Sequence, residues 1–177
     1  MIEHPIPTRA EVTDVANAIY EGVDAVMLSG ETSVGRYPAR CVEQLDKIAK
    51  NAERFPGLGY EKALTVSGDN QHVAEHAVAL AEALNAEGIV VITRRGVTAD
   101  FVTSARPHSV PIFAFTNNSQ TRRRLALNRA VSAHRIAFSS DPEITLQRSF
   151  DLLLEREGLH KACKLVVISD VLANQPT

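Results

Sequence analysis

Short apolar segments that alternate with amphipathic stretches restrict the fold of this chain more than any other feature. The apolar segments are five or six residues long, and the stretches between them carry apolar residues at helical spacing. This alternation predicts an α/β domain with three layers (α/β/α), a mostly parallel sheet and helices on both faces. Strands are expected at 89–93, 111–116, 134–138 and 164–168, and helices at 71–86, 98–105, 119–128 and 142–157.

Helical spacing also suggests which side chains these helices bury. The first helix is expected to bury Val73, Ala77, Leu80, Ala81 and Leu84. The last is expected to bury Ile144, Leu146, Phe150, Leu153 and Leu154.

Residues 1–54 carry a separate helix–strand–helix pattern. Thr8 and Glu11 have capping-box spacing, so a helix is expected to begin there and to end at Gly22. The apolar run 25–28 is read as a strand buried on both faces, and Pro38 opens a second helix. Alone, this part is too small to bury a core. Residues 55–69, rich in Gly and polar residues, are expected to link it to a second domain at 70–177.

Composition excludes several classes of protein. No apolar run approaches the ~18 residues that span a bilayer, and the N-terminal residues lack the pattern of a secretory signal, so no membrane partner is expected. Two cysteines, Cys41 and Cys163, are too few for a disulfide scaffold and favour a reducing compartment, here the cytoplasm. Six Phe, three Tyr and no Trp argue against a platform for stacking single-stranded nucleic acid.

The net charge of −2 hides an uneven distribution of charge. Between positions 94 and 135 the only acid is Asp100, whereas eight arginines stand at 94, 95, 106, 122, 123, 124, 129 and 135. A basic segment on an otherwise acidic chain indicates an anionic partner, either a small phosphate or a nucleic acid.

Two local patterns resemble known sites but lack essential parts. His72 and His76 have the spacing of a zinc peptidase, yet no third ligand is identifiable, so a solvated helix surface is favoured and no metal site is predicted. The loop from Gly30 resembles a P-loop, but Arg36 and Tyr37 stand where the lysine and the magnesium-binding hydroxyl are needed. The two cysteines are interpreted as packing or surface residues.

The loops that follow the first two strands of the second domain are the best candidates for an anion site. In an open parallel sheet, ligands bind at the carboxyl ends of the strands. The loop after the first strand offers arginines, hydroxyls and a helix start, which together suit a phosphate, although a solvated basic loop remains the alternative. The candidate residues are Thr93, Arg94, Arg95, Gly96, Thr98, Asn117 and Ser119.

Two stretches carry a specific family resemblance. Residues 7–18 read PTRAEVTDVANA, and residues 24–38 read DAVMLSGETSVGRYP. With the stretch from Asn85 to Thr116, they resemble pyruvate kinase over nearly the whole chain. The resemblance implies that residues 1–54 are the last helix–strand–helix portion of a (β/α)₈ catalytic barrel, and that 70–177 is the C-terminal regulatory domain.

The resemblance also carries functional expectations. Ser29 and Glu31 would lie on the rim of the barrel's active site, within the network that protonates the enolate. The family's ligands for Mg²⁺ and K⁺ and its catalytic lysine would lie upstream of this chain, so no cofactor is expected here. A small phosphorylated effector would bind the loop 93–98, where Arg94 and Arg95 replace the usual small hydroxyl residues. Self-association as a dimer or tetramer is expected, because family members are typically tetramers.

Three functional hypotheses follow. The chain is an inactive fragment of a glycolytic phosphotransferase that converts phosphoenolpyruvate and ADP to pyruvate and ATP, and it carries the allosteric and oligomerisation domain. Alternatively, it is a stand-alone module that binds a phosphorylated metabolite. Nucleic-acid binding through 122–124 is disfavoured, because base-stacking aromatics are missing there.

Overall fold

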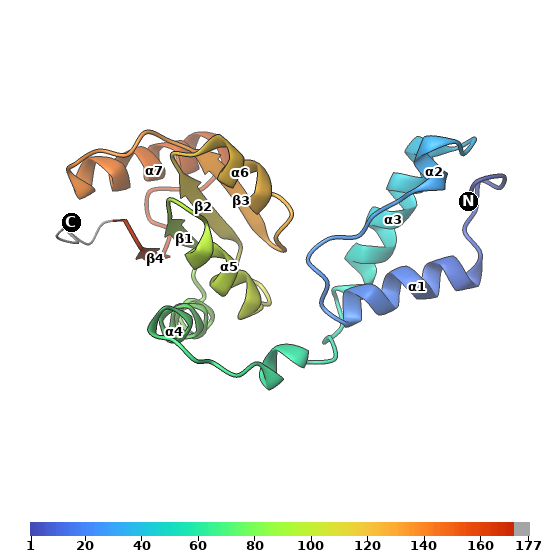
Figure 1. Ribbon diagram of the computed structural model, residues 1–177, viewed down its shortest axis with the longest axis horizontal. Helices are drawn as coiled ribbons and strands as arrows, with labels where there is room; N and C mark the ends of the chain where they lie inside the picture. The colour runs from blue at the N-terminus through green and yellow to red at the C-terminus, as the bar shows by residue number, and fades with distance from the viewer. Residues whose placement is uncertain (172–177) are drawn as a thin grey trace. The chain divides into compact units, whose positions relative to one another are not determined.

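The computed structural model describes residues 1–171, and these form two compact units (Figure 1). The first unit comprises Met1–Leu64 and the second begins at Thr65. The boundary falls inside the segment 55–69, where a short 3-10 helix, η1, spans Tyr60–Ala63. No helix in the described part of the chain combines the length and the apolar character needed to cross a membrane.

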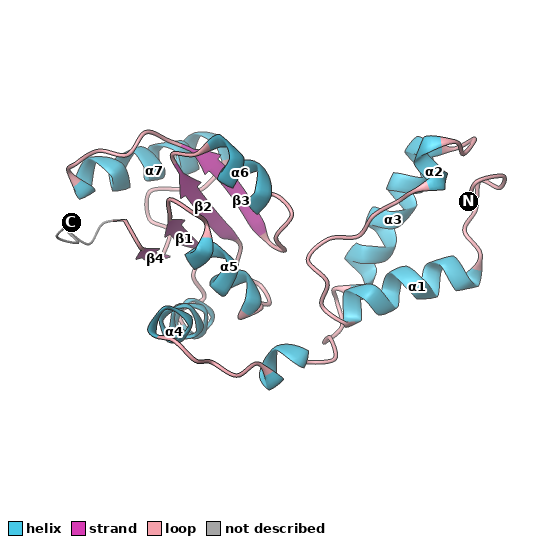
Figure 2. Ribbon diagram, viewed as in Figure 1, coloured by secondary structure: helices cyan, strands magenta, loops and turns pink. Residues whose placement is uncertain are grey.

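A four-stranded parallel sheet forms the centre of the second unit (Figure 2). Its strand order is β3-β2-β1-β4, so the first two strands of the sequence lie in the middle of the sheet. Both central strands are fully buried along their length, as expected of parallel strands covered on two faces. The strands are β1 (Gly88–Ile92), β2 (Ile112–Thr116), β3 (Val131–Arg135) and β4 (Leu165–Ser169).

Side-chain alternation along the strands builds two apolar cores. On β1, Ile89 and Val91 point to one face, against α4 (Asp69–Ala83), α5 (Val97–Ser104) and α6 (Ser119–Leu125). Val90 and Ile92 point to the other face, against α7 (Pro142–Arg156). The helix α7 therefore packs on the opposite face of the sheet from α4, α5 and α6. The α/β/α layering expected from the sequence is therefore confirmed, with all strand pairs parallel.

The first unit is helical. It contains α1 (Arg9–Tyr20), the single turn α2 (Gly30–Ser33) and α3 (Pro38–Ala52). The predicted capping box is present, because the Glu11 amide donates to Thr8 Oγ1 at 3.3 Å and the Thr8 amide donates to the Glu11 carboxylate at 2.7 Å. Gly22 adopts a left-handed φ of 79° after the helix, as its predicted role in ending the helix requires.

The strand expected at 25–28 is not formed. These residues have no regular secondary structure, and the side chain of Met27 is 88% exposed. A parallel strand gains its hydrogen bonds from neighbouring strands, and none is present within the first unit. The prediction of a helix–strand–helix unit was therefore wrong at its strand, while its two helices were correct.

The third strand of the second unit is β3 (131–135), three residues earlier than the predicted 134–138. Its residues are only partly buried, because β3 lies at the edge of the sheet. An edge strand tolerates polar residues such as Ser132 and Arg135. The prediction instead followed the more apolar run 136–138, and this explains the shift.

The face of α4 that is buried in the structure differs from the predicted face. The helix buries Ala74, Ala77, Val78 and Ala81, whereas Val73, Leu80 and Leu84 are about half exposed. Small alanines face the sheet because the helix packs closely on it, and the larger side chains are left on the outer face. On α7, Leu153 is buried as predicted but Ile144 is exposed.

Candidate functional site

The loop that connects β1 to α5 is fixed on one side by a carboxylate. Asp170, which directly follows β4, accepts hydrogen bonds from Thr93 Oγ1 and Thr98 Oγ1, both at 2.7 Å and both on its Oδ2 atom. Thr93 Oγ1 in turn accepts the amide of Gly96 at 3.0 Å. The two threonines thereby join the beginning and the end of the loop to the neighbouring strand.

The other side of the loop is held through its backbone carbonyls. Thr116 and Thr121 donate their hydroxyls to the carbonyl of Arg94 at 3.1 and 3.3 Å, and Arg124 donates to the carbonyl of Arg95 at 2.9 Å. These contacts fix the loop backbone and leave the Arg94 and Arg95 side chains exposed.

Gly96 is required by this arrangement. Its φ of +85° lies in the left-handed region, and a Cβ atom placed there would stand 2.4 Å from Arg124 Nη2. The glycine lets the chain turn from β1 into α5 while the guanidinium packs against its backbone. No side chain caps the start of α5, so the first amides of this helix have no side-chain acceptor.

These elements enclose a polar pocket, here called the β1 pocket, with a volume of about 440 Å³. Arg94 is further oriented by the ring of Phe138, whose centroid lies 5.5 Å from the guanidinium carbon. Two guanidiniums and the start of a helix favour an anion, while the Asp170 carboxylate favours a hydroxyl or another donor. The pocket is lined by Asn70, Arg94, Arg95, Val97, Thr98, Asp170 and Val171.

The structure groups some of the predicted anion-site residues and separates others. Arg94, Arg95 and Thr98 line the β1 pocket, and Thr93 lies fully buried next to it. Neither Asn117 nor Ser119 is among the described residues that line the pocket. Ser119 instead accepts a hydrogen bond from Arg135 at 3.0 Å.

Asp170 is the residue that sequence reasoning missed. It stands at the carboxyl end of the fourth strand, and the rule that drew attention to the loops after the first two strands applies equally there. The position of Asp170 after a parallel strand is the sequence signal that points to it.

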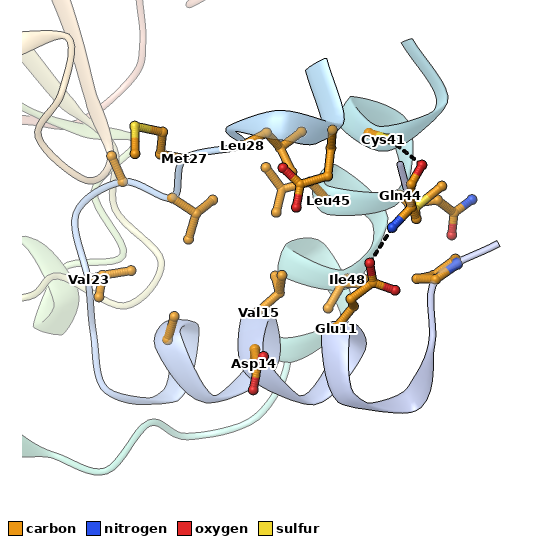
Figure 3. Close-up of a pocket in the computed structure, with 16 residues that line it drawn as sticks. Glu11, Asp14, Val15, Val23, Met27, Leu28, Cys41, Gln44, Leu45 and Ile48 are labelled. Carbon is orange, nitrogen blue, oxygen red and sulfur yellow. Dashed lines mark hydrogen bonds and ion pairs between the residues drawn. The ribbon is translucent and has the colours of Figure 1, made fainter. Parts of the chain in front are cut away.

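The first unit contains a different, largely apolar pocket of about 390 Å³ (Figure 3). Val15 of α1 and Leu45 and Ile48 of α3 point toward it, with Leu28 beside Leu45. At one end, the amine of Met1 is bonded to the Glu11 carboxylate. This bond and those from Thr8 lower the pKa of Glu11 to about 2.

Of the two predicted rim residues, Glu31 lines this pocket, whereas Ser29 is not among the described lining residues. The Glu31 carboxylate accepts the amide of Ser29 at 2.9 Å, and bonds from the backbone amides of Glu31 and Ser29 hold its pKa below the ordinary value. Glu31 is therefore an ionised carboxylate at neutral pH, and it lies in the first turn of the short helix α2. A carboxylate and a nearby hydroxyl are suited to passing a proton through water.

The described residues do not assemble a metal site. Within 1–171, no three His, Cys, Asp or Glu side chains come together in a way that could hold an ion. His72 and His76 are exposed on α4, as expected, and the His76 ring is bonded to the carbonyl of His72 at 2.8 Å. Cys41 is buried and Cys163 half-buried, and both are free thiols.

Comparison with known families matches both units of the chain. The profile described as "Pyruvate kinase, alpha/beta domain" matches residues 71–176, and the profile "Pyruvate kinase, barrel domain" matches residues 1–42. The chain is therefore similar to two consecutive parts of one kind of enzyme.

Individual relatives agree with this match. The chain is 38% identical to the pyruvate kinase of Dictyostelium discoideum over 190 residues, which cover 99% of this chain and 36% of that protein. It is 42% identical to the chloroplastic pyruvate kinase isozyme G of Ricinus communis, covering 90% of this chain and 40% of the relative. The crystal structure of a pyruvate kinase from Cryptosporidium parvum superposes with a TM-score of 0.86 at 30% identity, covering 98% of this chain and 36% of that one. The chain thus spans little more than a third of the length of these relatives.

Proposed function

The chain belongs to the pyruvate kinase family, and on that premise we propose that it acts as the C-terminal part of such an enzyme, binding a phosphorylated effector and associating with itself. The parent enzyme would transfer the phosphoryl group of phosphoenolpyruvate to ADP with Mg²⁺ and K⁺. The side chains described here do not fit those ions, so no step is assigned to metal in this chain. Free thiols at Cys41 and Cys163 fit a reducing compartment such as the cytoplasm.

In the whole enzyme, Ser29 and Glu31 would serve proton transfer to the enolate. The support is the ionised state of Glu31 and its bond to the Ser29 amide. Alone, the 177-residue chain would be inactive, because phosphoryl transfer depends on positioning and charge stabilisation that a short part of a barrel does not supply.

The observation that carries the effector proposal is the β1 pocket. Arg94 and Arg95 would bind a phosphate near the amides at the start of α5. The hydroxyls of Thr93 and Thr98 already donate to Asp170, so they have no proton left to offer to a phosphate. Asp170 would accept a ligand hydroxyl. A phosphate and a hydroxyl on one molecule indicate a sugar phosphate.

A hexose bisphosphate is expected to raise the melting temperature of the α/β unit, by about 5 °C when its concentration is ten times Kd. Changing both Arg94 and Arg95 to Gln is expected to weaken this binding at least about tenfold, because two charged contacts are lost. Differential scanning fluorimetry and calorimetric titration measure both effects. Arg123→Gln is the matched control, since Arg123 carries the same charge but does not line the β1 pocket. Equal losses in the control and the double variant would contradict the site.

Self-association is proposed through the outer face of α4. The C-terminal domain takes part in oligomerisation in this family. Val73, Leu80 and Leu84 recur at helical spacing on one face, and they are 52%, 50% and 45% exposed. A second copy of this chain would cover this apolar face.

Leu80→Lys is expected to weaken dimer formation about tenfold or more, because it puts a charge into an apolar contact. Sedimentation velocity over a range of protein concentrations measures the effect. Ile144→Lys is the control, since Ile144 is 44% exposed but lies on α7. A wild-type chain that stays monomeric at all concentrations, or a Leu80→Lys chain that sediments like wild type, would refute this interface.

A further inference from the structure

A second basic pocket lies at the edge of the sheet, away from the loop after β1. It has a volume of about 400 Å³ and lies among α6, β3 and α7. Ligand pockets in proteins commonly begin at about 300 Å³, so a small metabolite fits this space. We call it the β3 pocket, and it is lined by Arg122, Ala133, His134, Arg135, Leu152 and Arg156.

The three arginines of the β3 pocket have no acidic partner. Within residues 1–171, Arg122, Arg135 and Arg156 form no ion pair. Arg124 behaves differently, because its Nη1 atom lies 3.0 Å from both carboxylate oxygens of Asp100. Three arginines that line one pocket without an ion-pair partner leave their positive charge uncompensated, so an anion bound in the pocket would be stabilised.

Glu157, an acid that contacts the lining residue His134, is already bonded. Glu157 Oε1 accepts the hydroxyl of Ser132 at 2.7 Å and lies 2.9 Å from His134 Nε2. The His134 ring is stacked on Phe115 with 5.3 Å between the ring centroids. These contacts fix the imidazole as a wall of the pocket.

The pocket is also partly ordered in advance. Arg135 is the last residue of β3, and its guanidinium is bonded to Ser119 Oγ at 3.0 Å. Arg122 projects from α6 and Arg156 is the last residue of α7, so three separate elements supply the positive charge. The bond to Ser119 orients the Arg135 guanidinium before a ligand arrives, and this lowers the entropy lost when the ligand binds.

We propose that the β3 pocket is a second anion site, which binds a small phosphorylated compound through Arg122, Arg135 and Arg156. Guanidinium groups match the oxygens of a phosphate in paired hydrogen bonds, and a dianion balances more of the three charges than a carboxylate does. The site is separate from the β1 pocket and does not depend on effector binding there. No lining residue is shared between the two.

Titration of the full chain with inorganic pyrophosphate, followed by calorimetry and by amide shifts in NMR spectra, tests the proposal. Arg156→Gln and Arg135→Gln are each expected to raise the Kd of this site about tenfold, the usual value of one charged hydrogen-bonding contact. The two arginines lie on different elements, one at the end of a helix and one on an edge strand. Weaker binding in both variants is therefore not explained by a local change in folding at one of them. A parallel titration with glucose 6-phosphate distinguishes a site for bare phosphate from one that also accepts a phosphorylated sugar.

Two controls make the outcome decisive. Arg123→Gln removes the same charge from α6, the helix that carries Arg122, at a residue that lines neither pocket, and it is expected to leave the Kd unchanged. The Arg94→Gln, Arg95→Gln double variant disables the β1 pocket, and pyrophosphate is still expected to shift amides of β3 and α7. Absence of binding, equal weakening by Arg123→Gln, or complete loss in the double variant would overturn the second site. None of these results depends on whether a sugar phosphate binds the β1 pocket.

Discussion

The purified chain is expected to show no turnover of phosphoenolpyruvate and ADP above the uncatalysed background in the presence of Mg²⁺ and K⁺. Catalysed phosphoryl transfer depends on positioned charges and metal ions, and enzymes gain factors of about 10⁶ or more from such sites. The barrel-domain profile matches only residues 1–42 of this chain. Glu31 lines an apolar pocket, and the described residues hold no group of side chains that could bind a metal ion. A coupled assay for pyruvate measures the rate.

The control for this prediction is Glu31→Gln, which replaces the carboxylate with an amide of the same size. Both chains are expected to give the same background rate. Turnover by the wild-type chain that disappears in Glu31→Gln would contradict the inactivity of the fragment. Turnover that persists unchanged in Glu31→Gln would indicate a contaminating enzyme, and repeated purification should then remove it.

Phe115→Ala is expected to lower the free energy of unfolding of the α/β unit by about 3–5 kcal/mol. Phe115 is fully buried on β2, faces α7 and stacks on His134, so its removal leaves a cavity in one of the two cores. Since domains of this size are stable by about 5–15 kcal/mol, much of the folded population would be lost at moderate urea. Urea unfolding followed by circular dichroism measures the change.

Phe55→Ala provides the comparison for this result. Phe55 is 63% exposed and lies outside the α/β unit, so the same change of side chain is expected to cost under about 0.5 kcal/mol. If Phe115→Ala unfolds at the same urea concentration as Phe55→Ala, the packing of α7 on β2 is not as described.

The fold of the second unit was largely predictable because its central strands are buried on both faces. A continuous apolar run between two predicted helices, such as the one ending at Ile92, indicates a strand that is buried on both faces. Edges were harder. At β3 one side of the strand meets solvent, so polar residues from Ser132 onward obscured its true start. On α4, periodicity alone could not show whether Leu80 or Val78 faces the sheet, because both lie on apolar stripes of an alanine-rich helix.

The segment 25–28 has the sequence of a strand but does not form one. Its apolar sequence is that of a buried strand, but a strand exists only where another strand can pair with it. Met27 is exposed in the first unit for that reason. Local sequence carries the pattern suited to a larger assembly, whereas the conformation depends on the partners that are present.

The candidate site was predictable in its position but not in its connections. The rule for parallel sheets identified the loop with Arg94 and Arg95. It could not show that Asp170 would engage the hydroxyls of Thr93 and Thr98, since these residues are more than seventy positions apart in the sequence. Nor could it show that Ser119 would pair with Arg135, because that contact depends on the register of the edge strand.

We propose that the α/β unit binds a sugar phosphate in the β1 pocket. The most direct test is an NMR titration of the ¹⁵N-labelled chain with a hexose bisphosphate, with amide shifts mapped along the sequence. The largest shifts are expected at residues 93–98 and at Asp170, and they should vanish when Arg94 and Arg95 are both changed to Gln. Shifts confined to β3, α6 and α7, or no shifts at millimolar ligand, would contradict the claim.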